Sequence, residues 1–159
     1  MFRTSSLATM AAALCLALSA HAQTTAEADK PAVFDAELAR SLGANENGMR
    51  GYVFVLLKTG PNKVPAGAER DETFKGHFAN MGRLGKEGKL ALAGPLDGVD
   101  GWRGLYVFAV SEIEEARQLV ATDPVIIKGE MVAEYHKFFG SAALMLVHDA
   151  HAKIAKKRF

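Results

Sequence analysis

Cysteine is almost absent from this sequence, which has a single residue, Cys15, in 159 positions. Cys15 lies in an N-terminal apolar run that we expect to be removed from the mature chain. Without it, the protein has no disulfide, no thiolate nucleophile and no cysteine ligand for a metal. The remaining chain is long enough to bury a core without such cross-links.

An excess of charge of one sign is also missing, because 19 basic residues face 18 acidic residues, for a formal net charge of +1. Nucleic-acid binding needs a clustered positive field, so we expect no nucleic-acid partner. Basic residues cluster at Lys153, Lys156, Lys157 and Arg158, at the end of the chain. We interpret this cluster as a solvated helix tail rather than a membrane contact.

Long apolar runs are limited to Leu7–Ala20, which is shorter than the roughly 20 residues that span a bilayer. Arg3 precedes this run, and Ala20-His21-Ala22 has the small-x-small pattern of a cleavage site. The sequence therefore predicts a signal peptide over residues 1–22. A membrane anchor is the alternative that the short run argues against. We expect a periplasmic or secreted protein with no membrane contact after cleavage.

After the signal peptide, the chain divides into three predicted parts. Residues 23–48 form a polar leader with a short helix at 34–42. Residues 49–147 form the domain, and residues 148–159 form a helical tail.

Within the domain, hydrophobic periodicity switches repeatedly between the strand and helix periods. A capping box is expected from Ser111 to Glu114, at the start of the second long helix. The resulting order of strand, helix, strand, strand, helix, strand is the ferredoxin-like arrangement of an α+β domain. The predicted strands are 51–58, 89–93, 102–110 and 130–139, and the predicted helices are 69–86, 111–122 and a short helix after Asp123-Pro124.

The predicted first strand is apolar on both of its faces. Two helices can cover one face of a four-stranded sheet, so the second face needs another cover. The simplest cover is the same sheet of a second copy. We therefore expect a homodimer whose sheets pack face to face around a pocket.

His77 and Asp123 are the candidate catalytic residues. His77 borders the apolar face of the predicted helix 69–86, where it is either a general base or a histidine at the edge of the core. Asp123 can cap the helix that begins at Pro124, and its second oxygen can also orient a histidine. No serine or cysteine has the context of a nucleophile, so we interpret the pair as a base and its orienting carboxylate.

Four further residues are candidates for substrate binding. Arg103 and Lys58 each either bind an anionic substrate group or remain solvated charges. Tyr52 belongs either to the core or dimer interface or to the pocket. His136, on the predicted fourth strand, is a weaker candidate for a pocket or haem contact.

Histidines also occur in the tail, where His148 and His151 lie on one face of the predicted helix. With no third ligand nearby, this pair is better explained as part of a solvated tail than as a metal site. We therefore predict no metal and no cofactor.

Several of these features together resemble the YCII-related domain, over roughly residues 51–143. They are His77, the strand that ends at Gly94-Pro95, Ser111 with Glu114-Glu115-Ala116, and Asp123-Pro124. The resemblance implies a dimeric α+β barrel of ferredoxin-like subunits, in which His77 and Asp123 form the active-site pair.

The resemblance also suggests functions, because one related member is similar to dehydrochlorinases of hydroxylated aromatics, and isomerases and haem proteins share the barrel. The first hypothesis is a cofactor-independent lyase or isomerase of a small aromatic or unsaturated molecule. The second is a non-catalytic periplasmic ligand-binding or interaction module that uses the same dimer pocket. A haem protein is a third alternative, which a Soret band would reveal. The sequence does not identify the substrate.

Overall fold

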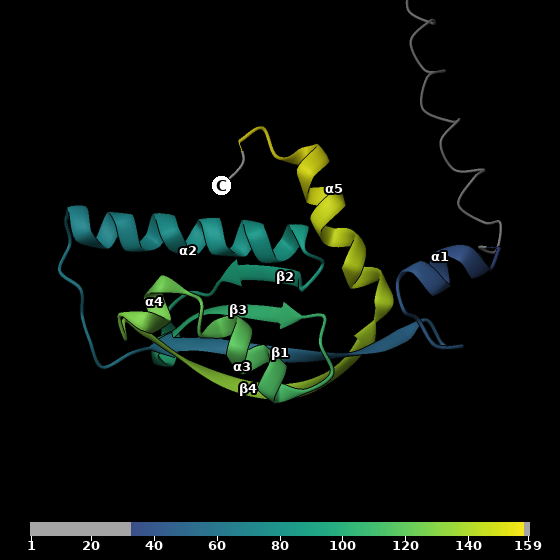
Figure 1. The fold of residues 1–159 in the computed structure, drawn as a ribbon, viewed down its shortest axis with the longest axis horizontal. Helices are drawn as coiled ribbons and strands as arrows, with labels where there is room; N and C mark the ends of the chain where they lie inside the picture. Colours follow the sequence, from purple (N-terminus) through teal and green to yellow (C-terminus); the bar gives the residue numbers. More distant parts are fainter. Residues whose placement is uncertain (1–32, 158–159) are drawn as a thin grey trace, which may run out of the picture. The chain divides into compact units, whose positions relative to one another are not determined.

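The computed structural model describes residues 33–157 of the chain (Figure 1). The predicted signal peptide, its cleavage site and Cys15 lie outside these residues. All the helices and strands belong to one unit that begins at Asp35. Within residues 33–157, no helix combines the length and apolar character needed to cross a bilayer.

The sheet has the strand order β2-β3-β1-β4, and every neighbouring pair is antiparallel. With two long connections carried by helices, this topology confirms the predicted ferredoxin-like α+β fold. The strands are β1 (Met49–Thr59), β2 (Leu90–Pro95), β3 (Trp102–Phe108) and β4 (Met131–Ser141). The helices are α1 (Ala36–Ser41), α2 (Ala68–Lys86), α3 (Ile113–Val120), α4 (Pro124–Ile127) and α5 (Val147–Ile154), with 3₁₀ segments η1 (Val99–Gly101) and η2 (Ala142–Leu146).

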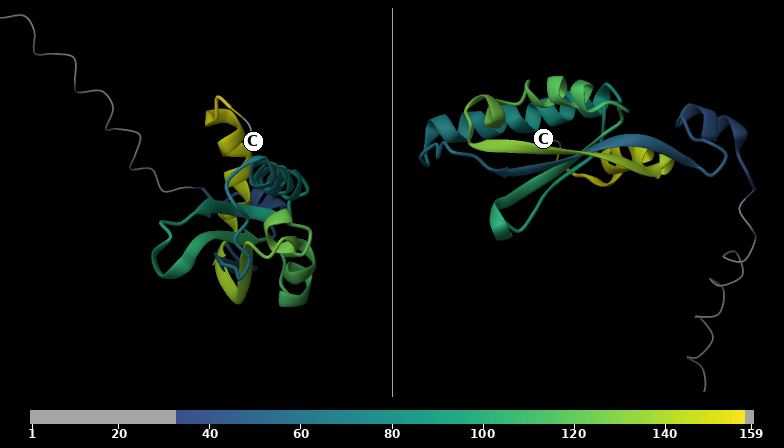
Figure 2. Two further views of the ribbon diagram at one scale, coloured as in Figure 1. Left: turned by 90° about the vertical axis from the view of Figure 1, so that its left-hand side faces the viewer. Right: turned by 90° about the horizontal axis from the view of Figure 1, so that it is seen from below.

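One face of the sheet is covered by α2, α3 and α4 (Figure 2). Alternation along β1 points Val53, Val55 and Leu57 at these helices, and all three are buried. They pack with Leu84 of α2 and Val120 of α3 in the main core.

The opposite face of the sheet has a second, smaller apolar cluster around Tyr52 and Val107. Leu144 and Met145 of η2 pack against this cluster, so the segment after β4 covers the end of the face near Tyr52. Other apolar side chains of this face stay partly open, and Val132 is 44% exposed. The described tail therefore covers part of the face that we expected a second copy to cover.

Two local predictions are wrong. The capping box at Ser111–Glu114 does not form, because α3 begins at Ile113 with Glu112 as its N-cap and has no side-chain cap bond. A helix that starts at this residue leaves the serine outside the N-cap position. Strand β4 also continues through Gly140 to Ser141 instead of ending there, because β1 pairs with it over the whole length.

Candidate active site

His77 is held on the core side of α2, where it is one of the helix's buried residues. Its side chain is 9% exposed. The residue before it, Gly76, lies against α4, and a Cβ there would come within 2.9 Å of the Pro124 ring. A glycine at this position therefore lets α2 approach the segment that carries Asp123.

Asp123 is fully buried in the turn between α3 and α4. As predicted, it caps α4, because its Oδ1 accepts a hydrogen bond of 3.2 Å from the backbone N–H of Val125. Pro124 follows at the first position of the helix, where its missing N–H leaves nothing unsatisfied. Capping thus fixes the direction of the Asp123 carboxylate.

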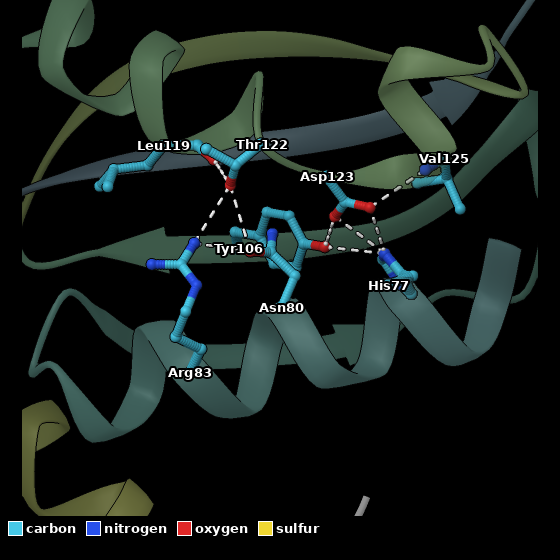
Figure 3. Close-up of polar contacts among 8 residues, drawn as sticks. All are labelled: His77, Asn80, Arg83, Tyr106, Leu119, Thr122, Asp123 and Val125. Carbon is cyan, nitrogen blue, oxygen red and sulfur yellow. Dashed lines mark hydrogen bonds and ion pairs between the residues drawn. The ribbon is translucent and has the colours of Figure 1, made fainter.

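The two predicted residues meet in the structure (Figure 3). His77 Nδ1 lies 3.0 Å from Asp123 Oδ1 and 2.9 Å from Oδ2. An ionised carboxylate can only accept hydrogen bonds, so Nδ1 carries the proton of this contact. In the neutral ring, Nε2 is then the basic nitrogen.

Tyr106 completes the site from β3 and is the functional residue that the sequence analysis missed. Its hydroxyl donates to Asp123 Oδ2 at 2.7 Å and lies 3.2 Å from His77 Nδ1. Burial, followed by the charge of Asp123 and this hydrogen bond, raises the pKa of Tyr106 far above its ordinary value, so the hydroxyl keeps its proton. The sequence did hold a signal for Tyr106. It alternates with Phe108 in an apolar strand, which predicts that it is buried, and a buried tyrosine hydroxyl needs a hydrogen-bond partner.

The second ring nitrogen of His77, Nε2, differs from Nδ1 in its contacts. Among the described residues, Nε2 has no hydrogen-bond partner, and it is not one of the fully enclosed polar atoms. The rings of Phe74 and Phe78 lie beside the imidazole, with centroids at 5.8 and 5.3 Å. The imidazole therefore has aromatic neighbours and one basic nitrogen without a hydrogen-bond partner among the described residues.

A second polar contact ties the turn before Asp123 to α2 (Figure 3). Arg83 Nη2 donates to Asn80 Oδ1 at 2.7 Å and to Thr122 Oγ1 at 3.3 Å. Thr122 Oγ1 in turn donates to Asn80 Oδ1 at 3.1 Å. Thr122, the residue before Asp123, is thus bound to α2 about one helical turn after His77.

Arg103 belongs to a separate charged group at the start of α2 and β4. Buried Glu130 accepts two hydrogen bonds from Arg70 at one oxygen, Oε1, at 2.9 and 2.7 Å. Arg103 Nη2 lies 3.9 Å from the same oxygen, and its guanidinium forms no hydrogen bond to a described residue. The other oxygen of Glu130 is buried and has no hydrogen-bond partner in the described part of the chain.

The three remaining candidates lie on the sheet face opposite His77. Glu134 joins two of them, since it contacts Lys58 Nζ at 3.3 Å and His136 Nε2 at 2.9 Å. The hydrogen bond from His136, and next that from Lys58, lowers the pKa of Glu134. Tyr52 donates its hydroxyl to the carbonyl of Ser141 at 2.9 Å. The structure therefore does not bring Lys58, Tyr52 or His136 together with His77 and Asp123.

For metals, residues 33–157 contain no group of three or more histidine, cysteine or acidic side chains arranged to hold an ion. His148 of the tail packs instead on α2, where a Cβ at Gly85 would come within 2.6 Å of its Nδ1. The predicted pair His148 and His151 thus borders α2 rather than standing clear of the domain.

The protein is thus a ferredoxin-like α+β domain with a buried His–Asp pair. The pair joins its first long helix, α2, to the turn after α3. The model of the YCII-related domain matches residues 52–138. The chain therefore belongs to the YCII-related domain family. A search of curated proteins finds no match. The matched region includes His77, Tyr106 and Asp123, and it ends before η2 and α5.

Proposed function

We propose that this protein is a cofactor-independent lyase or isomerase in which His77 is the general base. The observation that supports this most is the pairing of a buried carboxylate with Nδ1, which leaves Nε2 as a base without a partner in residues 33–157. Imidazole is well suited to carry a proton near neutral pH.

In the proposed reaction, Nε2 takes a proton from a carbon or hydroxyl group of the substrate and the ring becomes an imidazolium. Asp123 holds the ring in the required tautomer and stabilises its positive charge. In an elimination, the electrons of the broken bond form a double bond and expel a leaving group such as halide. In an isomerisation, the same proton returns to another atom of the substrate. Tyr106 stays protonated and orients Asp123.

The surround favours a small aromatic or unsaturated substrate, since Phe74 and Phe78 border the base. Arg103 offers donors that no described residue uses, and it is the group we assign to an anionic substituent of the substrate. We also propose that the protein acts as an exported homodimer, in which the partly open sheet faces pack together. Lys58, Tyr52 and His136 would then lie at the dimer pocket.

The test is a screen of hydroxylated aromatic halides and unsaturated halides. Each compound is assayed for halide release and, by NMR in D₂O, for exchange of its protons with solvent. For an active compound, we expect His77→Ala to lower the rate by about 10²–10⁴-fold. Asp123→Asn, which keeps the shape and removes the charge, should lower it by up to about 10⁴-fold.

The exposed residues His151 and Asp149 provide matched controls, as His151→Ala and Asp149→Asn. Both should retain the activity of the unchanged protein. Full activity in His77→Ala would exclude the proposed mechanism. Compounds that bind without turnover, and that bind equally well to His77→Ala, would instead support a ligand-binding module.

A further inference from the structure

A groove of about 650 Å³ lies between α2 and α5, apart from the His77 site. Small residues line it on both sides, namely Ala79 and Gly82 from α2, Ala152 from α5 and Ala155 directly after α5. Its volume lies within the range of about 300–1,000 Å³ that is usual for small-molecule sites. The α5 wall lies outside the region that matches the family.

The glycines of α2 show that Gly82 is unusual. Gly76 and Gly85 are required by close contacts, because a Cβ would come within 2.9 Å of Pro124 and 2.6 Å of the His148 ring, respectively. A Cβ at Gly82 would meet no atom within 4 Å. Glycine in a helix interior is less stable than alanine, so packing within the described chain gives no reason for glycine here. The open space beside Gly82 is part of the groove, which Gly82 lines.

The charged side chains of the groove favour an anion. Arg83 is paired with Glu87 at 3.0 Å, so these two charges balance. Lys86 also lines the groove and has no ion-pair partner within residues 33–157. His148 and His151 add polar ring nitrogens on the α5 side. The groove therefore combines small residues with a positive charge, that of Lys86, which no ion pair within residues 33–157 balances.

We propose that this groove binds an amphipathic organic anion. Its apolar body, of one or two rings, packs on Gly82 and Ala152, and its carboxylate or equivalent group pairs with Lys86. This site is independent of the proposed function at His77. It places a second ligand on the opposite side of α2 from the core.

The test uses 2-naphthoate as the probe and 2-naphthamide as its neutral counterpart, with the full mature chain followed by ¹⁵N and methyl NMR. We expect saturable shifts at Ala79, Gly82 and Ala152 with naphthoate. The amide should bind at least about fivefold more weakly, because it lacks the ion pair with Lys86.

Substitutions in both helices that line the groove test whether naphthoate binds there. Gly82→Leu and Ala152→Leu each fill the groove, and we expect at least about tenfold weaker binding in either. Ala150→Leu, on an exposed position of α5 that does not line the groove, is the matched control and should bind normally. Two filling variants on different helices guard against misfolding of one.

The role of the positive charge is tested by Lys86→Gln. The control is Lys75→Gln on the same helix, because Lys75 does not line the groove and its Nζ lies 3.2 Å from a carboxylate oxygen of Glu72. Arg83 is left unchanged because it also contacts Thr122, beside Asp123. We expect Lys86→Gln to remove the preference for acid over amide, and His77→Ala to leave naphthoate binding intact.

Three outcomes would overturn the proposal. They are equal affinity for the acid and the amide, unchanged binding in both filling variants, and no binding of naphthoate. If Gly82→Leu instead disrupts self-association of a protein that does not bind naphthoate, the groove is a protein contact. Loss of catalysis in His77→Ala with retained naphthoate binding would separate this site from the proposed active site.

Discussion

Asp123 is the residue on which the candidate site depends, because its buried carboxylate accepts from three groups at once. These are the imidazole of His77, the hydroxyl of Tyr106 and the backbone N–H of Val125. A buried carboxylate is stable only with such compensation. The same contacts that stabilise it also fix which nitrogen of His77 is basic.

This arrangement predicts the tautomer of His77. In the neutral ring, the proton should reside on Nδ1, because Asp123 can only accept. The measurement is two-dimensional ¹H–¹⁵N NMR of the ring, which distinguishes the two nitrogens. Asp123→Asn, whose side chain also has donors, should reduce the preference for this tautomer. An Nε2-protonated ring in the unchanged protein would contradict the assigned direction of the hydrogen bond.

Tyr106→Phe should remove one hydrogen bond to a buried charged group and keep the ring packing. We expect the free energy of unfolding to fall by about 1.5–3 kcal/mol, measured by urea denaturation. Tyr135→Phe is the control, because its hydroxyl has no hydrogen bond to a described residue and its ring contact with Arg117 is kept. Equal losses in the two variants would show that the bond from Tyr106 to Asp123 adds no stability.

The tyrosines also predict how stability depends on alkaline pH. Burial raises the pKa of Tyr52, Tyr106 and Tyr135 above the ordinary tyrosine value of about 10 in the folded protein. Above about pH 10, the unfolded chain loses these protons while the folded chain keeps them, so stability falls as pH rises. Denaturation between pH 8 and 11 should show this fall, with a shallower slope in Tyr106→Phe. A slope that is the same in both proteins would contradict the role of Tyr106.

Sequence reasoning found two of the three residues of the site. His77 was indicated by its place beside an apolar helix face, and Asp123 by the proline that follows it. Tyr106 was not singled out, because sequence alone does not give the strand register that places its hydroxyl beside His77. In the structure, Tyr106 pairs with Val55 across the β1–β3 ladder, on the helix-covered face.

At the scale of elements, the contact between α2 and α4 sets the distance between His77 and Asp123. Gly76→Ala should force Pro124 away and destabilise the fold by about 1–3 kcal/mol through overpacking. Gly82→Ala, in the same helix, should instead stabilise it by roughly 0.5–1 kcal/mol, since its Cβ meets no neighbour. Thermal unfolding of both variants measures the difference. A gain in stability for Gly76→Ala would show that Pro124 relaxes without strain.

Most elements were predictable because their periodicity is strong and their ends carry glycine or proline. The exceptions are segments whose conformation depends on contacts with residues distant in the sequence. Strand β4 passes Gly140 because β1 offers a pairing residue, Arg50, at that position. The segment after it forms the 3₁₀ turn η2, and Leu144 packs against the second apolar cluster of the sheet.

At the scale of the whole molecule, the partly open sheet face predicts self-association. Light scattering should give about twice the monomer mass at micromolar concentration, since the exposed apolar side chains of this face favour a second copy. Leu105→Glu, in the middle of the face, should shift the equilibrium to monomers, whereas Val99→Glu, on η1, should not. Circular dichroism checks that both variants fold. A monomer in the unchanged protein would show that η2 gives sufficient cover.

The connection of His77 to Asp123 also bears on the kinetics of folding. The two residues are 46 positions apart in the chain, and Tyr106 lies 17 positions before Asp123. Desolvation of the Asp123 carboxylate is favourable only after α2, β3 and α4 have packed together. Earlier burial would leave the carboxylate without the hydrogen-bond donors that these elements supply. We therefore expect these bonds to form after the folding transition state. Changes at this junction should then accelerate unfolding and leave the folding rate nearly unchanged. The site would thus set the lifetime of the native state, through the unfolding rate constant, and have little influence on the folding rate constant.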